Sequence, residues 1–188
     1  MDKENPLDWT KILNPHREAT IDRMRNYPVV LCVQDTTELD FNGQRIAGLG
    51  PLSYESQRGM YLHPTYVVTP NRIPLGILDA WMWPRAFKDS EGNRPGIKES
   101  LRWEEGYERV AELAQRMPET RLVYVADLEA DIVSLMNKAD EPGCPADWLI
   151  RSRHNRALEE GENLWNSCHN YELRDRGSAG RAIPRNDS

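Results

Sequence analysis

Two aspartates, Asp35 and Asp127, each follow directly on an apolar run of the sequence. Asp35 comes after VVLCVQ, and Asp127 comes after LVYVA. Apolar runs rich in β-branched residues are typical of central strands buried on both faces of a sheet. A carboxylate at the end of such a strand is well placed to hold Mg²⁺, which prefers oxygen ligands. The alternative is structural, because aspartate also caps helices and shapes turns.

The elements that must position these two acids follow from the hydrophobic pattern. The clearest is a helix in which Trp103, Tyr107, Val110, Ala114 and Met117 recur at spacings of three and four. Pro64 lies inside a strand pattern and is expected at the start of that strand or at a bulge. The sequence predicts, in chain order, a helix, three strands, a helix, a strand, a helix and a strand, over residues 15–26, 29–34, 60–69, 73–83, 98–117, 122–126, 131–139 and 147–153.

This order of elements predicts an α/β fold of ribonuclease-H type, a mixed five-stranded sheet flanked by helices. The first three strands can pair as an antiparallel meander, and the helical crossovers favour parallel pairing of the later strands. In that topology the first and fourth strands are neighbours at the centre. Asp35 and Asp127, which are 92 positions apart in sequence, would then lie within reach of one metal ion.

Composition narrows the function classes. With 188 residues, the chain is long enough for one domain with a small appendage. A formal charge of −6 argues against a protein coated in basic surface, although it allows a local basic patch. Neither a membrane span nor the apolar core of a signal peptide is visible, so a cytoplasmic location without membrane contact is expected. The three cysteines are Cys32, Cys144 and Cys168, whose number and spacing indicate neither a disulfide framework nor a thiolate zinc site.

Four segments, in this order, resemble the catalytic core of bacterial insertion-sequence transposases of the DDE group, which have a ribonuclease-H-like or retroviral-integrase fold. They are VVLCVQDTTELDF, GLGPLSYESQRGMYLHP, KESLRW and YVADLEADI. The resemblance covers roughly residues 15–165. It implies Mg²⁺-dependent cleavage and strand transfer at transposon ends, with Mn²⁺ as an alternative cofactor. Asp35 and Asp127 match the first two catalytic, metal-binding acids of that family.

Other residues in these segments receive weaker assignments. Glu129 and Asp131 are expected to be acids in the first turn of a helix, where they favour its dipole, rather than metal ligands. Leu128 departs from the arginine that the family commonly has there. The segment RSRHNR resembles the part of the family that runs along DNA, and its Arg forks suit phosphate oxygens. Its predicted DNA-binding residues are Arg151, Arg153, His154 and Arg156. The alternative is an ordinary solvated turn.

The resemblance stops before the third carboxylate. In the family this is a Glu within a Tyr-x2-Arg-x3-Glu-x6-Lys pattern, and the nearest match, Tyr171-x2-Arg174, places Ser178 at the Glu position. The sequence therefore predicts a catalytic core truncated at the C-terminus and inactive alone. The expected organisation is a helical lead-in over 1–27, an incomplete core over 28–165 and an irregular or disordered tail over 166–188.

Two other functions stay open at this level. The chain could be a non-catalytic fragment that binds transposon-end DNA or the full-length transposase and inhibits the intact enzyme. It could also be a metal-dependent nuclease whose third ligand is Glu159, Glu160 or Glu162. The expected partners are transposon-end DNA and either a second copy of the chain or an intact transposase.

Overall fold

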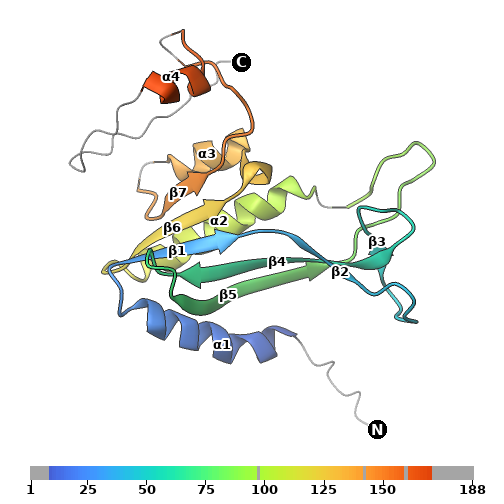
Figure 1. Cartoon of the computed structure of the whole chain (residues 1–188). Helices are drawn as coiled ribbons and strands as arrows, with labels where there is room; N and C mark the ends of the chain where they lie inside the picture. The colour runs from blue at the N-terminus through green and yellow to red at the C-terminus, as the bar shows by residue number, and fades with distance from the viewer. Residues whose placement is uncertain (1–8, 97, 142, 159–160, 171–188) are drawn as a thin grey trace.

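The computed structural model describes residues 9–96, 98–141, 143–158 and 161–170 (Figure 1). The helices in these ranges are α1 (Trp9–Met24), α2 (Ser100–Gln115), the 3₁₀ helix η1 (Leu128–Ala130), α3 (Val133–Ala139) and α4 (Leu164–Asn170). The strands are β1 (Val29–Gln34), β2 (Thr37–Asp40), β3 (Gly50–Pro51), β4 (Arg58–Val68), β5 (Pro74–Trp83), β6 (Arg121–Ala126) and β7 (Asp147–Ile150). No helix in the described ranges is both long and apolar enough to cross a membrane.

The strands form a single mixed sheet with β1 near its centre. On one side β1 pairs antiparallel with β4, which also pairs antiparallel with β5. On the other side β1 pairs parallel with β6, and β6 pairs parallel with β7. The two parallel steps pass through α2 and α3, as crossover connections require. The predicted sheet of ribonuclease-H type is therefore confirmed. Two short strands, β2 and β3, also pair with β4 and extend the sheet beyond the five predicted strands.

Pro64 lies in the interior of β4, so of its two expected places, a strand start or a bulge, the first is wrong, and the second agrees with an irregularity one residue away. Its β5 partner is Ala80, and the pairing of β4 with β5 shifts register one residue later. On the opposite side β1 ends with Gln34 paired to Thr65, and β2 begins with Thr37 paired to Leu62. Proline has no N–H to donate to a ladder. It therefore occupies the point where the chain leaves β1 and the ladder opens.

Helix α1 begins at Trp9, six residues before the predicted start at residue 15. Pro15 lies inside it, where a proline removes one helical hydrogen bond. The sequence pattern placed the proline at the helix start instead. Packing against β5 compensates, because Thr20 of α1 is buried beside Gly76. A Cβ at Gly76 would lie 2.2 Å from Thr20 Oγ1, so only glycine allows this close approach.

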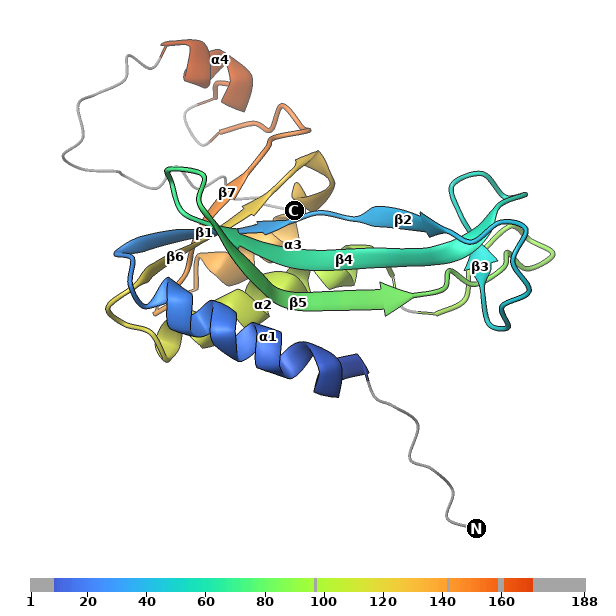
Figure 2. The ribbon, with the colours of Figure 1, turned by 60° about the horizontal axis from the view of Figure 1, so that its bottom comes forward.

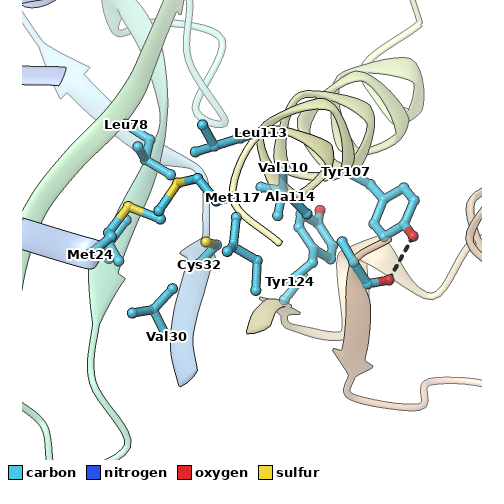
Figure 3. Packing of buried hydrophobic residues seen from close by; sticks show 14 of the residues in the cluster. Met24, Val30, Cys32, Leu78, Tyr107, Val110, Leu113, Ala114, Met117 and Tyr124 are labelled. Atoms are coloured by element: carbon cyan, nitrogen blue, oxygen red, sulfur yellow. Dashed lines mark hydrogen bonds between the residues drawn. The ribbon is translucent and has the colours of Figure 1, made fainter. Parts of the chain in front are cut away.

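The core lies on the face of the sheet that α1 and α2 cover (Figure 2), with α1 against β5 and α2 against β6 and β1. Met24 from α1, Cys32 from β1 and Tyr124 from β6 are fully buried there (Figure 3). The predicted apolar stripe of α2 is confirmed, since all five of its residues are buried. Tyr107 adds a hydrogen bond, donating its hydroxyl to the carbonyl oxygen of Ala146 at 3.0 Å.

The opposite face of the sheet is only partly covered by the described residues. Burial alternates along β1, so that Leu31 and Val33 are half-buried while their neighbours are fully buried. Tyr66 and Leu149 are 40% and 62% exposed. The expectation that β1 is buried on both faces is therefore wrong for the described part of the chain.

The predicted tail divides between described and undescribed residues. Residues 166–170 belong to α4 rather than to an irregular segment. Residues 171–188, together with Glu159 and Glu160, lie outside the described residues.

Candidate active site

The two predicted metal ligands leave the sheet at the same level from neighbouring strands. The last paired residues of β1 and β6 are Gln34 and Ala126, and Asp35 and Asp127 follow them directly. Strands β1 and β6 lie side by side at the centre of the sheet (Figure 1), and neighbouring strands are about 4.8 Å apart. Asp35 and Asp127 therefore follow the carboxyl ends of two adjacent parallel strands. The structure thus brings the two predicted residues together. Their role as ligands stays a prediction.

Each carboxylate uses one oxygen to fix its own backbone. Asp35 Oδ1 accepts a hydrogen bond from the N–H of Thr36 at 2.8 Å. Asp127 Oδ1 accepts one from the N–H of Glu129 at 2.8 Å and so caps η1. The structural alternative is therefore confirmed for Asp127, which caps a helix. Each acid still has one oxygen available for a ligand, because Oδ2 of both acids has no hydrogen-bond donor among the described residues.

Glu129 belongs electrostatically to the same site. Burial raises the pKa of its carboxyl, and the charges of Asp127, Asp35 and Glu99 raise it further, against the opposing charge of Arg153. Even so, no three His, Cys, Asp or Glu side chains of the described ranges are arranged to hold one metal ion. Glu129 is therefore a neighbour of the aspartate pair, whose charges raise the pKa of its carboxyl.

Asp131 anchors the segment that follows β7. The expectation that it belongs to the first turn of a helix is wrong, because it ends η1 and α3 starts two residues later. Its Oδ2 accepts hydrogen bonds from the N–H groups of Arg153 and His154 at 2.6 and 2.9 Å, and its Oδ1 pairs with Arg156. Burial opposes ionisation, but these bonds outweigh it and lower the pKa of Asp131.

The four predicted DNA-binding residues lie at the same sheet edge as the aspartate pair. The N–H of Arg151 bonds to the carbonyl oxygen of Ala126, which places it next to Asp127. Arg151, Arg153 and His154 are exposed. Arg156 differs, because its side chain is 12% exposed and is held by the fully buried carboxylate of Asp131. Three of the four can therefore face a ligand, while the fourth positions them.

His63, to which the sequence assigned no role, supports the chain next to Asp35. Its Nδ1 lies 2.7 Å from Thr36 Oγ1, and its side chain is 2% exposed. Burial, followed by the charges of Arg102 and Arg109, lowers the pKa of His63 to about 4. The ring is therefore neutral at pH 7. Nδ1 and the Thr36 hydroxyl share one hydrogen bond, whose direction depends on the tautomer of the ring.

A buried polar cluster ties three strands together beneath the carboxylates. Tyr124 of β6 donates its hydroxyl to Gln34 Oε1 at 2.6 Å. Gln34 Nε2 in turn donates to Thr65 Oγ1 of β4 at 3.3 Å. Burial and the charge of Asp127 both raise the pKa of Tyr124. The signal available in the sequence was a glutamine ending a buried strand, where its amide needs buried partners.

Comparisons with known proteins include a distant structural likeness. No protein-family model matches the chain, and no curated protein matches it. Among solved structures, the chain is similar to a piggyBac transposase in a synaptic complex with hairpin DNA, studied by cryo-electron microscopy. The TM-score is 0.41 at 13% sequence identity, and the alignment covers 93% of this chain. The chain spans 34% of the length of that transposase.

Proposed function

We propose that this chain is the metal-binding core of a DNA transposase of the DDE group, related to those of bacterial insertion sequences. The observation that carries the proposal is the register of β1 and β6, which aligns Asp35 with Asp127 at the sheet edge. The resemblance of the segments around both acids to that family supports the same assignment.

The donor set fits a hard divalent cation such as Mg²⁺, with Mn²⁺ as an alternative. Asp35 and Asp127 offer carboxylate oxygens, which these ions prefer. In each acid, Oδ1 accepts a hydrogen bond from a nearby backbone N–H, which fixes the carboxylate. Oδ2 remains without a donor in the described part of the chain. The chemistry that bound divalent cations supply in such sites is activation of a water or 3′-hydroxyl and stabilisation of the leaving oxygen.

The other residues of the edge bind and orient the DNA in this proposal. Arg151 and Arg153 contact phosphates, because guanidinium groups match phosphate oxygens in pairs. Asp131 and Arg156 hold the backbone from which these two arginines project. Thr36 and His63 keep the chain after Asp35 in place.

Metal binding tests the proposal directly. Mn²⁺ affinity can be measured by electron paramagnetic resonance on the purified chain. We expect it to fall by more than about tenfold in Asp35→Asn and in Asp127→Asn, because even the loss of a residue that only supports a ligand weakens metal binding by about tenfold or more. Asp22→Asn is the matched control, because Asp22 is an exposed acid on α1. Equal affinity in all four proteins would contradict the proposed site.

The 188-residue chain alone is expected to bind metal but not to cut DNA, because only two acids of the sequence match the family's ligands. EDTA-sensitive cleavage of transposon-end DNA by the wild type would overturn that expectation. Loss of such cleavage in Asp35→Asn would still support the metal site.

A second candidate is a non-catalytic fragment that binds an intact transposase and inhibits it. The partly covered sheet face favours it, because exposed apolar surface such as Leu149 and Tyr66 suits a protein partner. Inhibition of an intact relative by the added chain would support this function. Unchanged activity of the relative at micromolar chain would count against it.

A further inference from the structure

A small cavity opens beside the aspartate pair, between the end of the β4–β5 hairpin and the first turn of α2. Its volume is about 200 Å³, and its walls include Thr36, His63, Trp83, Arg102 and Glu129. Thr36 follows Asp35 directly and donates its N–H to that carboxylate, and the N–H of Glu129 bonds to the carboxylate of Asp127 at 2.8 Å. The cavity therefore adjoins the candidate metal site without sharing its two ligands.

Arg102 is a buried cation, two of whose guanidinium nitrogens meet no acceptor in the part of the chain that the structure describes. The residue is 7% exposed, and its guanidinium lies 3.8 Å from the centre of the Trp83 ring and 4.7 Å from that of Trp81. Its Nε and Nη1 are buried, and neither meets an acceptor among the described residues. Burial lowers the pKa of this guanidinium. The charges of Glu105 and Glu99 oppose this shift, but neither carboxylate forms a hydrogen bond with Arg102 in the described part of the chain. Buried donors without acceptors are costly unless a ligand supplies them.

A second polar atom in the same cavity is also unused. Nε2 of His63 is buried and has no partner in the described ranges, and it is a free donor in the tautomer that carries the proton there. Two of the three acids of the cavity wall are already engaged. Glu38 accepts from Tyr61 and from the backbone of Ser53, and Glu99 pairs with Arg85. The unpaired donors of Arg102, with His63 Nε2 beside them, fit a small anionic acceptor.

The cavity continues outward into a larger one of about 690 Å³, which shares Trp83 and Arg102 with it. Cationic side chains dominate the walls of the larger cavity: Arg85, Lys88, Arg94, Lys98 and Arg102. Its two acids are Glu99 and Glu55, and the latter pairs with both Lys88 and Arg94. Lys98 forms no ion pair within the described part of the chain, and it stands just before α2, whose N-terminus lacks a side-chain cap. A helix N-terminus adds further positive potential.

We propose that Arg102 and His63 Nε2 bind a phosphate of a DNA strand that reaches the Asp35–Asp127 edge through the larger basic cavity. This inference rests on the proposed function, whose substrate is DNA, and adds a second contact surface on the opposite side of the aspartate pair from Arg151. Trp83, which forms one wall of both cavities, stacks on Tyr61 and carries the Arg102 guanidinium, so it holds this cation at the cavity wall.

DNA binding in EDTA tests this inference apart from the metal site. The probe is a fluorescein-labelled DNA duplex with a single-stranded end, and the dissociation constant is measured by anisotropy over a salt series. In Arg102→Met, which keeps the side-chain stem, we expect about tenfold weaker binding and a log–log salt slope lower by about 1, as for the loss of one phosphate contact. Arg116→Met, an exposed position at the end of the same helix, should bind as the wild type does.

Thermal unfolding without DNA separates a binding role from a structural one. We expect Arg102→Met to melt close to the wild type, because methionine keeps an apolar stem that packs on the rings of Trp81 and Trp83. Wild-type affinity and slope in Arg102→Met would overturn the inference, as would absence of DNA binding by the wild type. Neither result would touch the Mn²⁺ test of Asp35 and Asp127, so the two proposals can fail separately.

Discussion

Gly106 of α2 lies directly against the side chain of Gln34 at the end of β1. A Cβ at Gly106 would lie 2.1 Å from Gln34 Oε1 and 2.2 Å from its Nε2. Gln34 is 4% exposed and bonds to both Tyr124 and Thr65. The missing side chain therefore lets the helix cover the polar cluster one residue before Asp35.

Replacing Gly106 with alanine should destabilise the fold. Helix propensity alone favours the change by about 1 kcal/mol. Overpacking in a well-filled interior costs about 1–3 kcal/mol, and Gln34 cannot move aside without losing its buried hydrogen bonds. We expect the free energy of unfolding in urea to fall by about 1–2 kcal/mol. Gln115→Ala, at an exposed position of the same helix, should change it by less than about 0.5 kcal/mol. A Gly106→Ala protein more stable than the wild type would show that Gln34 gives way freely.

Asp131→Asn should be among the most destabilising single changes near the site. It leaves Arg156, whose side chain is 12% exposed, without its counter-charge. Breaking a buried pair in this way costs about 3–5 kcal/mol, which chemical denaturation would measure. Asp147→Asn is the control, because its partner Arg121 is 63% exposed and a surface pair contributes about 1 kcal/mol or less. Similar small losses in both variants would mean that Asp131 and Arg156 contribute as a surface pair does.

The strands and the aspartate pair could be predicted because local signals determine them. The run before Asp35 is rich in β-branched residues, and the run before Asp127 is apolar. The order of elements suggests a sheet of ribonuclease-H type, and in that topology these two strands are neighbours. This step needs only the order of elements, not their packing. The register that aligns the two acids was the consequence confirmed by the structure.

The features that could not be predicted depend on contacts between distant segments. The place of Pro64 inside β4 is set by the break between β1 and β2, which no local pattern encodes. The sequence suggested a helix acid at Asp131 because the groups that bond to its carboxylate are distant in the chain. These are the N–H groups of Arg153 and His154, which follow a strand end more than twenty residues later. The burial of Arg102 could not be predicted either. Its local sequence is an ordinary charged helix turn, and the rings that cover its guanidinium, those of Trp81 and Trp83, come from β5.

His63 should make stability depend on pH in the mildly acidic range. Its pKa is about 4 in the folded protein against an ordinary value of 6.5, so between these values the unfolded chain takes up a proton that the folded one does not. Stability is therefore complete above pH 6.5 and is lost as the pH falls toward 4, by up to about 3 kcal/mol at 1.36 kcal/mol per pKa unit. His63→Asn, whose amide oxygen can replace Nδ1, should flatten this part of the profile. His16→Asn, on the exposed side of α1, should not. An unchanged profile in His63→Asn would assign the acid sensitivity to other groups.

Glu129 offers a direct report on charge at the aspartate pair. Burial comes first among the causes that raise its pKa, followed by the charges of Asp127 and Asp35. Asp127→Asn should therefore lower the pKa of Glu129, and Asp35→Asn should lower it by less. Saturating Mg²⁺ should lower it in the wild type, because a cation held by the two aspartates cancels their charge, and should have little effect in Asp127→Asn. Carbon-13 NMR titration of the Glu129 carboxyl measures all four cases. A pKa that Mg²⁺ leaves unchanged in the wild type would place any bound cation away from Asp35 and Asp127.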